Sequence, residues 1–453
     1  MTRPVTGFVQ YLSRFVSEDS INKVAKETGF LKRKSTINPL TFLESVFFRS
    51  QGCSPSLSEL AIDLQKNGSK AVSKQAVDKR FNGCTEAMLR KLFSLVSGDQ
   101  IKLKAPLSPD KQNIGRCDSK YFTQIRIMDS TEFLVSKKAA AVFPGYGGKG
   151  REAIVQLQYE YDILNHEITQ LSLGSALDSD AIEGMKEIDQ VPKGSLLIRD
   201  LGYNNPKAFK ELAKRELFFI SRAKFQWSIF IKGENGKLIR LTALQILDRL
   251  KELKKQNEKY LDIEVWLGDQ ARTPVRLIAN LLTEEQTNKR IEIKRNRNGS
   301  RLSADQQALA SLNLFVTNVP KADYDAQSMY QLYSLRWQIE LIFKTLKSVM
   351  KLHQFHSMNA TRLTCVILIK LLWVLLNWQI LALVRRVSGS EISFHKLCQT
   401  LTSRSLQLRS ETLKNRQKLK EWLLEIVGIS LRFHLKEYKK GTENILIKLL
   451  TTI

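Results

Sequence analysis

Apolar residues recur at helical spacing at both ends of the chain. Near the N-terminus, the runs TFLESVFF (41–48) and AMLRKLFSLV (87–96) place apolar side chains three and four residues apart. From about residue 326 the same spacing returns and continues to Ile453. We therefore expect residues 1 to about 115, and most of the chain after residue 326, to be helical.

Between these regions the pattern changes to alternation, which is typical of strands. Ile125–Val135 alternates, Glu152–Leu173 has the pattern of a hairpin, and Leu196–Ile198 is a short apolar run. A helix over 205–216 and a strand over 217–223 are predicted next. Three antiparallel strands followed by alternating helix and strand predict an α/β fold built on an open mixed sheet.

Residues 226–325 depart from that rhythm. Short alternating runs separated by polar turns predict a β-rich insertion; these runs are WSIFIKG, KLIRLTAL, LDIEVWLG, KRIEIKR and LNLFVTNV. One stretch inside the insertion, LQILDRLKELKK (244–255), is compatible with a helix instead.

The chain carries a large positive charge. Its 71 Lys and Arg residues exceed its 45 Asp and Glu residues, so the net charge is +26. Such an excess favours a polyanionic partner, because phosphate contacts dominate the affinity of proteins for nucleic acids. A basic protein without such a partner, or one that binds a membrane surface, is the alternative. The 43% of hydrophobic residues excludes a disordered protein.

Two features bear on the compartment. The first residues, MTRPVTGFVQ, lack an apolar signal core, and the five cysteines contain no CxxC pair, which favours a reducing cytoplasm. Leu363–Val384 is nearly long enough to cross a bilayer, but Lys370 lies near its middle, where a charge is costly. We interpret this segment as a buried core helix and expect no membrane association.

One pair of N-terminal segments has the form of a helix-turn-helix. Leu57–Gln65 is followed by a turn at Gly68 and by a second basic helix that begins after Ser73. The side chains that this motif would place near DNA are Lys74, Gln75, Lys79 and Arg80. An ordinary helical hairpin with a solvated basic face explains the motif equally well.

A second basic segment lies in the insertion, in the run NKRIEIKRNRNGSR. Its cations include Lys294, Arg295 and Arg297. A run of charge is commonly a solvated face, but in so basic a chain a role in following a phosphate backbone is at least as well supported.

The segment MYQLYSLRWQIELIFKTLKS places four polar residues together. At about 100° per residue, Tyr333, Arg336, Glu340 and Lys347 fall within an arc of roughly 60°, beside an apolar stripe. A carboxylate and two cations are thereby fixed at the edge of a core. The alternative is a surface helix on which Arg336 and Glu340 form an ordinary pair worth about 0.2–0.5 kcal/mol.

Two aspartates occur where strands are expected. Asp129 interrupts an apolar strand and Asp200 ends another, and buried carboxylates are costly unless paired or bound to metal. Together with Glu340 they fit a phosphoryl-transfer site, because carboxylate oxygens suit Mg²⁺ and two such ions can assist an in-line displacement. No His/Cys cluster suggests zinc, and no GxSxG motif suggests a serine hydrolase.

The spacing Tyr333-x₂-Arg336-x₃-Glu340-x₆-Lys347 resembles the YREK signature of the large insertion-sequence transposase family often called IS four. The motifs DSTEF at Asp129 and RDLGY at Asp200 are similar to the two other acidic motifs of that family. The resemblance implies a ribonuclease-H-like catalytic core, interrupted by a β-rich insertion before the helix that carries the glutamate.

The resemblance also implies roles for single residues. By it, Asp129, Asp200 and Glu340 are the catalytic DDE residues, with two Mg²⁺ ions, or Mn²⁺, as cofactors. The residues expected to contact phosphates at the transposon end are Tyr333, Arg336 and Lys347. Where relatives that use a hairpin intermediate have a Trp, this chain offers Phe315, so the hairpin step stays open.

The expected function is that of a DNA transposase that binds terminal inverted repeats and catalyses cut-and-paste transposition. Its expected partners are double-stranded DNA, at the transposon ends and the target, and a second copy of the chain in a synaptic homodimer. The expected location is the cytoplasm, at the bacterial nucleoid. A catalytically silent DNA-binding descendant and a ribonuclease-H-fold nuclease are the alternatives.

These expectations divide the chain into five parts. Residues 1–115 are expected to be an all-helical DNA-binding domain, and 116–225 the first part of the catalytic core. The insertion is expected at 226–325. The second part of the core, which contains the helix with the glutamate, is expected at 326–390, and a helical C-terminal region at 391–453.

Overall fold

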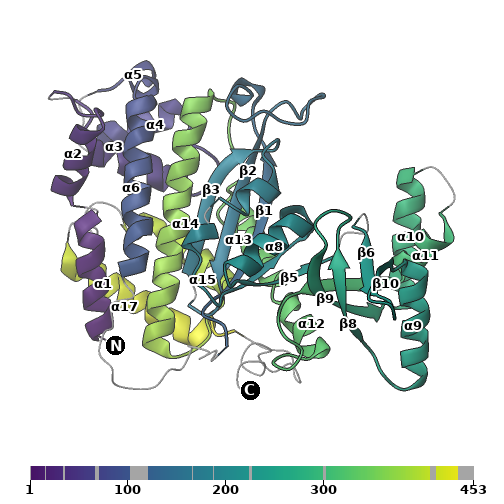
Figure 1. Cartoon of the computed structure of the whole chain (residues 1–453). Helices are drawn as coiled ribbons and strands as arrows, with labels where there is room; N and C mark the ends of the chain where they lie inside the picture. Colours follow the sequence, from purple (N-terminus) through teal and green to yellow (C-terminus); the bar gives the residue numbers. More distant parts are fainter. Residues whose placement is uncertain are drawn as a thin grey trace.

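The computed structural model describes residues 2–15, 17–33, 36–66, 71–102, 121–165, 167–186, 188–223, 227–298, 302–408 and 415–436. The predicted turn at Gly68 and the predicted boundary near residue 115 lie outside these residues. Within them, a helical region packs beside one large sheet, and a second group of strands and helices extends from the far end of that sheet (Figure 1).

The N-terminal region is helical in the described residues, as its apolar spacing predicts. Its helices are α1 (Thr2–Phe15), α2 (Glu18–Glu27), α3 (Pro39–Arg49), α4 (Leu57–Lys66), α5 (Lys74–Asp78) and α6 (Gly83–Lys102). Polar side chains define several of their starts. Asn38, for example, accepts hydrogen bonds from the amides of Leu40 and Thr41, and Pro39 occupies the first turn, where no amide donor is needed.

Among the described residues, ten strands form one mixed sheet in the order β3-β2-β1-β4-β5-β10-β9-β8-β6-β7. Those of the first half are β1 (Ile125–Leu134), β2 (Ile154–Asp162), β3 (Glu167–Ser175), β4 (Leu196–Arg199) and β5 (Phe218–Arg222). β1, β4 and β5 are parallel, whereas β2 and β3 run antiparallel to their neighbours. The predicted strands, hairpin and mixed sheet are confirmed.

The register of β1 and β4 brings the two aspartates together where the pairing of these strands ends. Met128 pairs with Arg199, so Asp129 and Asp200 follow side by side on neighbouring parallel strands. Side chains alternate between the two faces of a strand, and Asp129 therefore lies on the face of Ile127, and Asp200 on that of Ile198. Both isoleucines belong to the core cluster that also contains residues of the helix carrying Glu340.

The insertion continues the same sheet. Its strands are β6 (Ile229–Lys232), β7 (Leu238–Arg240), β8 (Leu261–Leu267), β9 (Thr273–Leu281) and β10 (Leu312–Thr317). β10 joins the two halves because it pairs antiparallel with β5 on one side and with β9 on the other. The strands of 226–325 are thus hydrogen-bonded to those of the preceding segment.

Helices cover this extension of the sheet. They are α9 (Ala243–Lys255), α10 (Glu284–Asn298) and α11 (Ala304–Ala310). α9 confirms the helical interpretation of 244–255. The prediction of a strand at KRIEIKR is wrong, because these residues lie in α10. Thr283 and Gln286 exchange hydrogen bonds at the start of that helix, and Glu284 and Glu285 occupy its first turn, where carboxylates are stabilising.

The remaining elements follow β10 or connect the strands. The α-helices are α7 (Asp180–Glu183), α8 (Pro206–Lys214), α12 (Ala326–Ser334), α13 (Trp337–Ser348), α14 (Ala360–Ser388), α15 (Phe394–Ser403) and α17 (Arg416–Phe433). The 3₁₀ turns are Lys137–Ala139, Ile188–Gln190, Leu201–Tyr203 and Ser405–Leu408.

The long helix α14 joins the helical region to the sheet. Its side chains share one core cluster with the N-terminal helices, with β1 and β2 and with α13. Among the described helices, it is the one long and apolar enough to cross a membrane, and 83% of its most apolar window is buried inside the protein. Lys370 within it is 3% exposed and donates to the carbonyls of Gly52 and Lys351.

The helix expected over Tyr333–Lys347 is interrupted. α12 ends at Ser334 and α13 begins at Trp337, although Leu335 and Arg336 between them keep right-handed helical angles. Ile339, Ile342, Phe343 and Leu346 of α13 are buried against the sheet face that carries Asp129 and Asp200. The break therefore lies beside Asp129, where the pairing of β1 with β4 ends.

Candidate active site

Arg336 joins two carboxylates that are far apart in the sequence. Its Nη1 atom lies 2.8 Å from Oδ2 of Asp129 on β1, and its Nη2 atom lies 2.7 Å from Oε1 of Glu340 on α13. The side chain of Arg336 is 13% exposed, whereas the side chains of Asp129 and Glu340 are 22% and 38% exposed. The ion pair of Arg336 with Glu340 is thus not an isolated surface pair but half of a bridge to the sheet.

Asp200 lies next to this bridge, at the end of β4. It occupies the N-cap position of the turn at Leu201–Tyr203 but makes no side-chain cap hydrogen bond. Its negative charge raises the pKa values of Asp129, Tyr333 and Arg336. Asp200 is therefore within electrostatic reach of Asp129, of Tyr333 and of the Arg336 guanidinium.

The pKa of Asp129 is raised to about 6. Burial is the main cause, and the charges of Asp200 and Glu340 add to it, while the Ser130 amide and Arg336 act in the opposite direction. For Arg336, burial lowers the pKa, but Tyr333 and the three carboxylates outweigh it and the net shift is upward. Three carboxylates thus share one region around a single guanidinium.

The two other residues of the signature also face the sheet. Tyr333 is 6% exposed, its ring centroid lies 4.7 Å from that of Phe315, and the Arg222 guanidinium is 5.8 Å from its centre. Burial, with the charge of Asp200, raises its pKa to about 12. The Nζ atom of Lys347 lies 3.2 Å from the carbonyl oxygen of Glu132, three residues beyond Asp129.

The chemistry of these groups fits a hard divalent cation. Three carboxylates offer the oxygen ligands that Mg²⁺ and Mn²⁺ prefer, and water and substrate phosphate normally complete the shell. Among the described residues, however, no group of three or more His, Cys, Asp or Glu side chains is arranged to hold a metal ion. The guanidinium of Arg336 lies between Asp129 and Glu340 instead.

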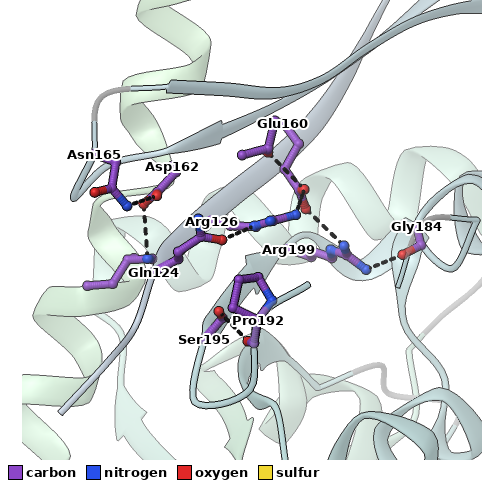
Figure 2. A network of polar contacts seen from close by, with 11 residues as sticks. Gln124, Arg126, Glu160, Asp162, Asn165, Gly184, Pro192, Ser195 and Arg199 are labelled. Carbon is purple, nitrogen blue, oxygen red and sulfur yellow. Dashed lines mark hydrogen bonds and ion pairs between the residues drawn. The ribbon is translucent and has the colours of Figure 1, made fainter. Parts of the chain in front are cut away.

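A buried ion network supports the aspartates from the other face of the sheet. Glu160 on β2 accepts hydrogen bonds from Arg199 at 2.9 Å and from Arg126 at 3.2 Å (Figure 2). It also accepts a hydrogen bond from the hydroxyl of Thr169. Burial raises the pKa of Glu160, but the two guanidinium groups outweigh it and the net shift is downward. Arg199 directly precedes Asp200, so the network fixes the strand that carries it.

Sequence reasoning did not identify this network. The run QLQYEYD, in which Gln156, Gln158, Glu160 and Asp162 alternate with apolar residues, predicts a strand with one face in water. In the structure all nine residues of β2 are buried, so the polar row faces protein. Two features of the sequence pointed to this network: the alternating polar residues of β2, and the arginine directly before the candidate catalytic Asp200.

The residues of the predicted helix-turn-helix differ in their surroundings. Lys74, Gln75 and Lys79 are exposed, on or just after α5, which has five residues. Arg80 instead packs over the ring of Phe30 and donates to the Phe30 carbonyl, and burial lowers its pKa. Arg80 thus stabilises the fold of the helical region.

The basic residues of the insertion lie on α10. Arg295 is exposed, Lys294 is partly buried, and Arg297 belongs to the same helix. Burial and the neighbouring charge of Arg290 lower the pKa of Lys294. Arg290 donates to the carbonyl of Leu312 on β10, which attaches this basic helix to the strand that joins the two halves of the sheet.

Comparisons with known proteins place these residues in context. Residues 120–376, which include Asp129, Asp200 and Glu340, match the family described as transposase DDE domain. The chain is 30% identical over 466 residues to the transposase for insertion sequence element IS1151 of Clostridium perfringens, with 97% of this chain and 96% of that protein covered.

Two further matches are more partial or more distant. Identity is 29% to the transposase for IS231D of Bacillus thuringiensis subsp. finitimus, over 79% of this chain and 76% of that protein. Among solved structures, a piggyBac transposase synaptic complex with hairpin DNA aligns with a TM-score of 0.46 at 10% identity, over 98% of this chain and 87% of that one. That likeness is too distant to bear on function.

Proposed function

Because the chain belongs to the DDE transposase family, we propose that Asp129, Asp200 and Glu340 are the carboxylates of its metal-dependent active site. The chain is the transposase of an insertion sequence, an enzyme that cleaves DNA and joins the cleaved end to new DNA. The observation that carries the assignment is the bridge from Arg336 to Asp129 and Glu340, with Asp200 in the same electrostatic neighbourhood.

The three carboxylates would hold the divalent cation that this family uses; we propose two Mg²⁺ ions, with Mn²⁺ as a substitute. When bound, such ions activate the attacking oxygen and stabilise the leaving oxygen. β1 and β4 hold Asp129 and Asp200 on neighbouring strands, and α13 brings Glu340 over them. The buried network at Glu160 keeps both strands in register.

The cations beside the carboxylates would position DNA. Arg336 offers a planar guanidinium suited to a bidentate grip on a phosphate, and Lys347 offers a point charge. Tyr333 is buried between Phe315 and Arg222, where it would fix the position of Arg336. The spacing of Tyr333, Arg336, Glu340 and Lys347 supports assignment to the IS four branch of insertion-sequence transposases.

The sheet supports the remaining architectural proposals. Antiparallel β3-β2-β1 followed by parallel β1-β4-β5, with one acid within β1 and another directly after β4, is the arrangement expected of a ribonuclease-H-like core. We assign this core to 116–225 and 326–390, the insertion to 226–325, and a helical C-terminal region to 391–453. Residues 1–115 would bind the terminal inverted repeats.

The partners follow from the reaction. Double-stranded DNA, as transposon end and as target, is the substrate, and the net charge of +26 suits it. A synaptic homodimer would hold two ends together. The reaction would take place in the cytoplasm, at the nucleoid, without a membrane.

The decisive test is Glu340→Gln in the full chain. This variant should lose cleavage and end joining but still bind the element's ends, because Gln removes a metal ligand and keeps the shape of the side chain. Glu421→Gln, on the exposed face of α17, is the matched control and should keep both activities. Cleavage by Glu340→Gln would show that the carboxylate assignment is wrong, and cut ends without joined products would indicate a nuclease.

A further inference from the structure

The guanidinium of Arg336 lies between two of the proposed metal ligands, Asp129 and Glu340. Its two terminal nitrogens contact Asp129 and Glu340, and the charge of Asp200 also acts on it. One cation thus partly neutralises three carboxylates. A divalent ion that binds Oδ2 of Asp129 and Oε1 of Glu340 has to displace those two hydrogen bonds.

The location of Arg336 allows such a displacement. The residue lies in the short interruption between α12 and α13, and the next residue, Trp337, is 65% exposed. The Arg336 side chain itself is 13% exposed, and a change of its rotamer breaks no backbone hydrogen bond of α12 or α13. Moving the guanidinium into water leaves negatively charged carboxylates in a partly buried site without a partner, which costs free energy. That cost falls if a DNA phosphate binds the guanidinium and a metal ion takes its place beside the carboxylates.

We propose that Arg336 exchanges between the carboxylates of Asp129 and Glu340 and a DNA phosphate, so that metal binding and DNA-end binding are thermodynamically coupled through this one side chain. The inference rests on the proposed function, because it takes those carboxylates as metal ligands. In the absence of DNA, Arg336 would act as an internal competitor of the metal ion. DNA would remove the competitor and so raise the affinity for metal.

The coupling is reciprocal. If a bound DNA end raises the affinity for metal by some factor, metal has to raise the affinity for the DNA end by the same factor. The active site would then bind metal fully only after a DNA end is bound. The free protein would carry a neutralised site, which would limit metal-dependent cleavage of DNA elsewhere.

The test measures Mn²⁺ binding to the full chain by electron paramagnetic resonance, first without DNA. Arg336→Gln should bind Mn²⁺ at least about tenfold more tightly than the unchanged protein, and Arg336→Lys, which can reach one carboxylate at a time, should lie between them. Lys344→Gln is the matched control, because it removes the same charge from an exposed position of α13 and should change the affinity little. If Arg336→Gln does not fold, Arg336→Lys decides the result.

The second arm adds a duplex that ends in the element's terminal repeat. DNA should tighten Mn²⁺ binding in the unchanged protein by at least about tenfold and have a much smaller effect in Arg336→Gln. Equal or weaker Mn²⁺ binding by Arg336→Gln without DNA would overturn the proposal. The proposal would also be overturned if DNA tightened Mn²⁺ binding as much in Arg336→Gln as in the unchanged protein. Phosphate oxygens that bind the metal ion directly would then explain the effect. Neither result depends on cleavage, so failure of the coupling is distinguishable from failure of the proposed function.

Discussion

Glu160 and Arg199 form a buried ion pair, 2.9 Å between Oε1 and Nη2, on the sheet face opposite the candidate active site. Their side chains are 3% and 4% exposed. Arg126 approaches the other carboxylate oxygen, so one glutamate on β2 links the strands that carry Asp129 and Asp200. Such a pair fixes strand register because its alternatives leave a charge without a partner in the core.

Breaking this pair should destabilise the protein strongly. Glu160→Gln leaves Arg199 and Arg126 buried without a carboxylate, which should lower the free energy of unfolding by about 3–5 kcal/mol. Glu252→Gln removes one partner of an exposed pair with Lys255 and should cost less than about 1 kcal/mol. Urea unfolding of both variants makes the comparison, and equal costs would mean that the network adds no more than a surface pair does.

Lys370 should make stability depend on alkaline pH. Burial lowers its pKa in the folded protein to about 8, against about 10.4 in an unfolded chain. Below pH 8 the lysine is charged in both states and its burial is costly. Between about pH 8 and 10 the unfolded chain binds more protons, so stability rises with pH, by up to about 1.4 kcal/mol per unit.

Lys370→Met supplies the reference for that measurement. Unfolding free energies of the unchanged protein and of the variant are compared at pH 8 and pH 10, which cancels the other titrating groups. The unfolding free energy of the unchanged protein, relative to that of Lys370→Met, should be about 1–3 kcal/mol higher at pH 10 than at pH 8. A difference that stays constant would show that the folded and unfolded pKa values of Lys370 are similar.

The four basic and polar residues near α5 should separate into two classes. Lys74→Ala with Gln75→Ala should weaken binding to the element's ends and leave stability nearly unchanged, because both side chains are exposed. Arg80→Ala should lower stability by about 1–2 kcal/mol, because it loses a contact with the Phe30 ring and a hydrogen bond to the Phe30 carbonyl. Thermal melts and DNA titrations distinguish the classes; a stable Arg80→Ala that loses specific binding would place Arg80 at the DNA.

The basic face of α10 should act on DNA without regard to sequence. Lys294→Gln with Arg295→Gln should weaken binding to specific and unrelated duplexes alike, and should reduce the salt slope by about two. Lys210→Gln with Lys214→Gln is the charge-matched control, since these residues are exposed on α8, across the sheet from α13. A loss confined to the element's ends would instead indicate that α10 reads sequence.

Most strands of the first half of the sheet could be predicted because their alternation is long and regular. Ile125–Val135 coincides with β1 to within a residue, and the predicted hairpin at Glu152–Leu173 coincides with β2 and β3 to within two. The strand prediction at KRIEIKR was wrong because two isoleucines two residues apart have the alternation of a strand over only a very short stretch. Neither isoleucine is fully buried, and the capping interaction at Thr283 lies upstream of the run.

The candidate site was only partly predictable. Helical geometry predicted that Arg336 lies beside Glu340. The places of Asp129 and Asp200 in the expected strands indicated two further candidate carboxylates, and the resemblance supported the same three acids. That Arg336 reaches across to Asp129 depends on a contact over 207 positions, which no local pattern contains. Glu160 was missed for a similar reason: whether a polar strand face meets water or protein is decided by segments that pack on it later in the chain.

The proposed reaction requires Asp129, Asp200 and Glu340 to bind the same metal ions. The most direct measurement is anomalous diffraction from crystals of the full chain with Mn²⁺ and a DNA end. We predict a manganese peak at about 2.0–2.2 Å from oxygens of these carboxylates, with Arg336 on a phosphate. Manganese bound elsewhere, with Arg336 still between Asp129 and Glu340, would contradict the account.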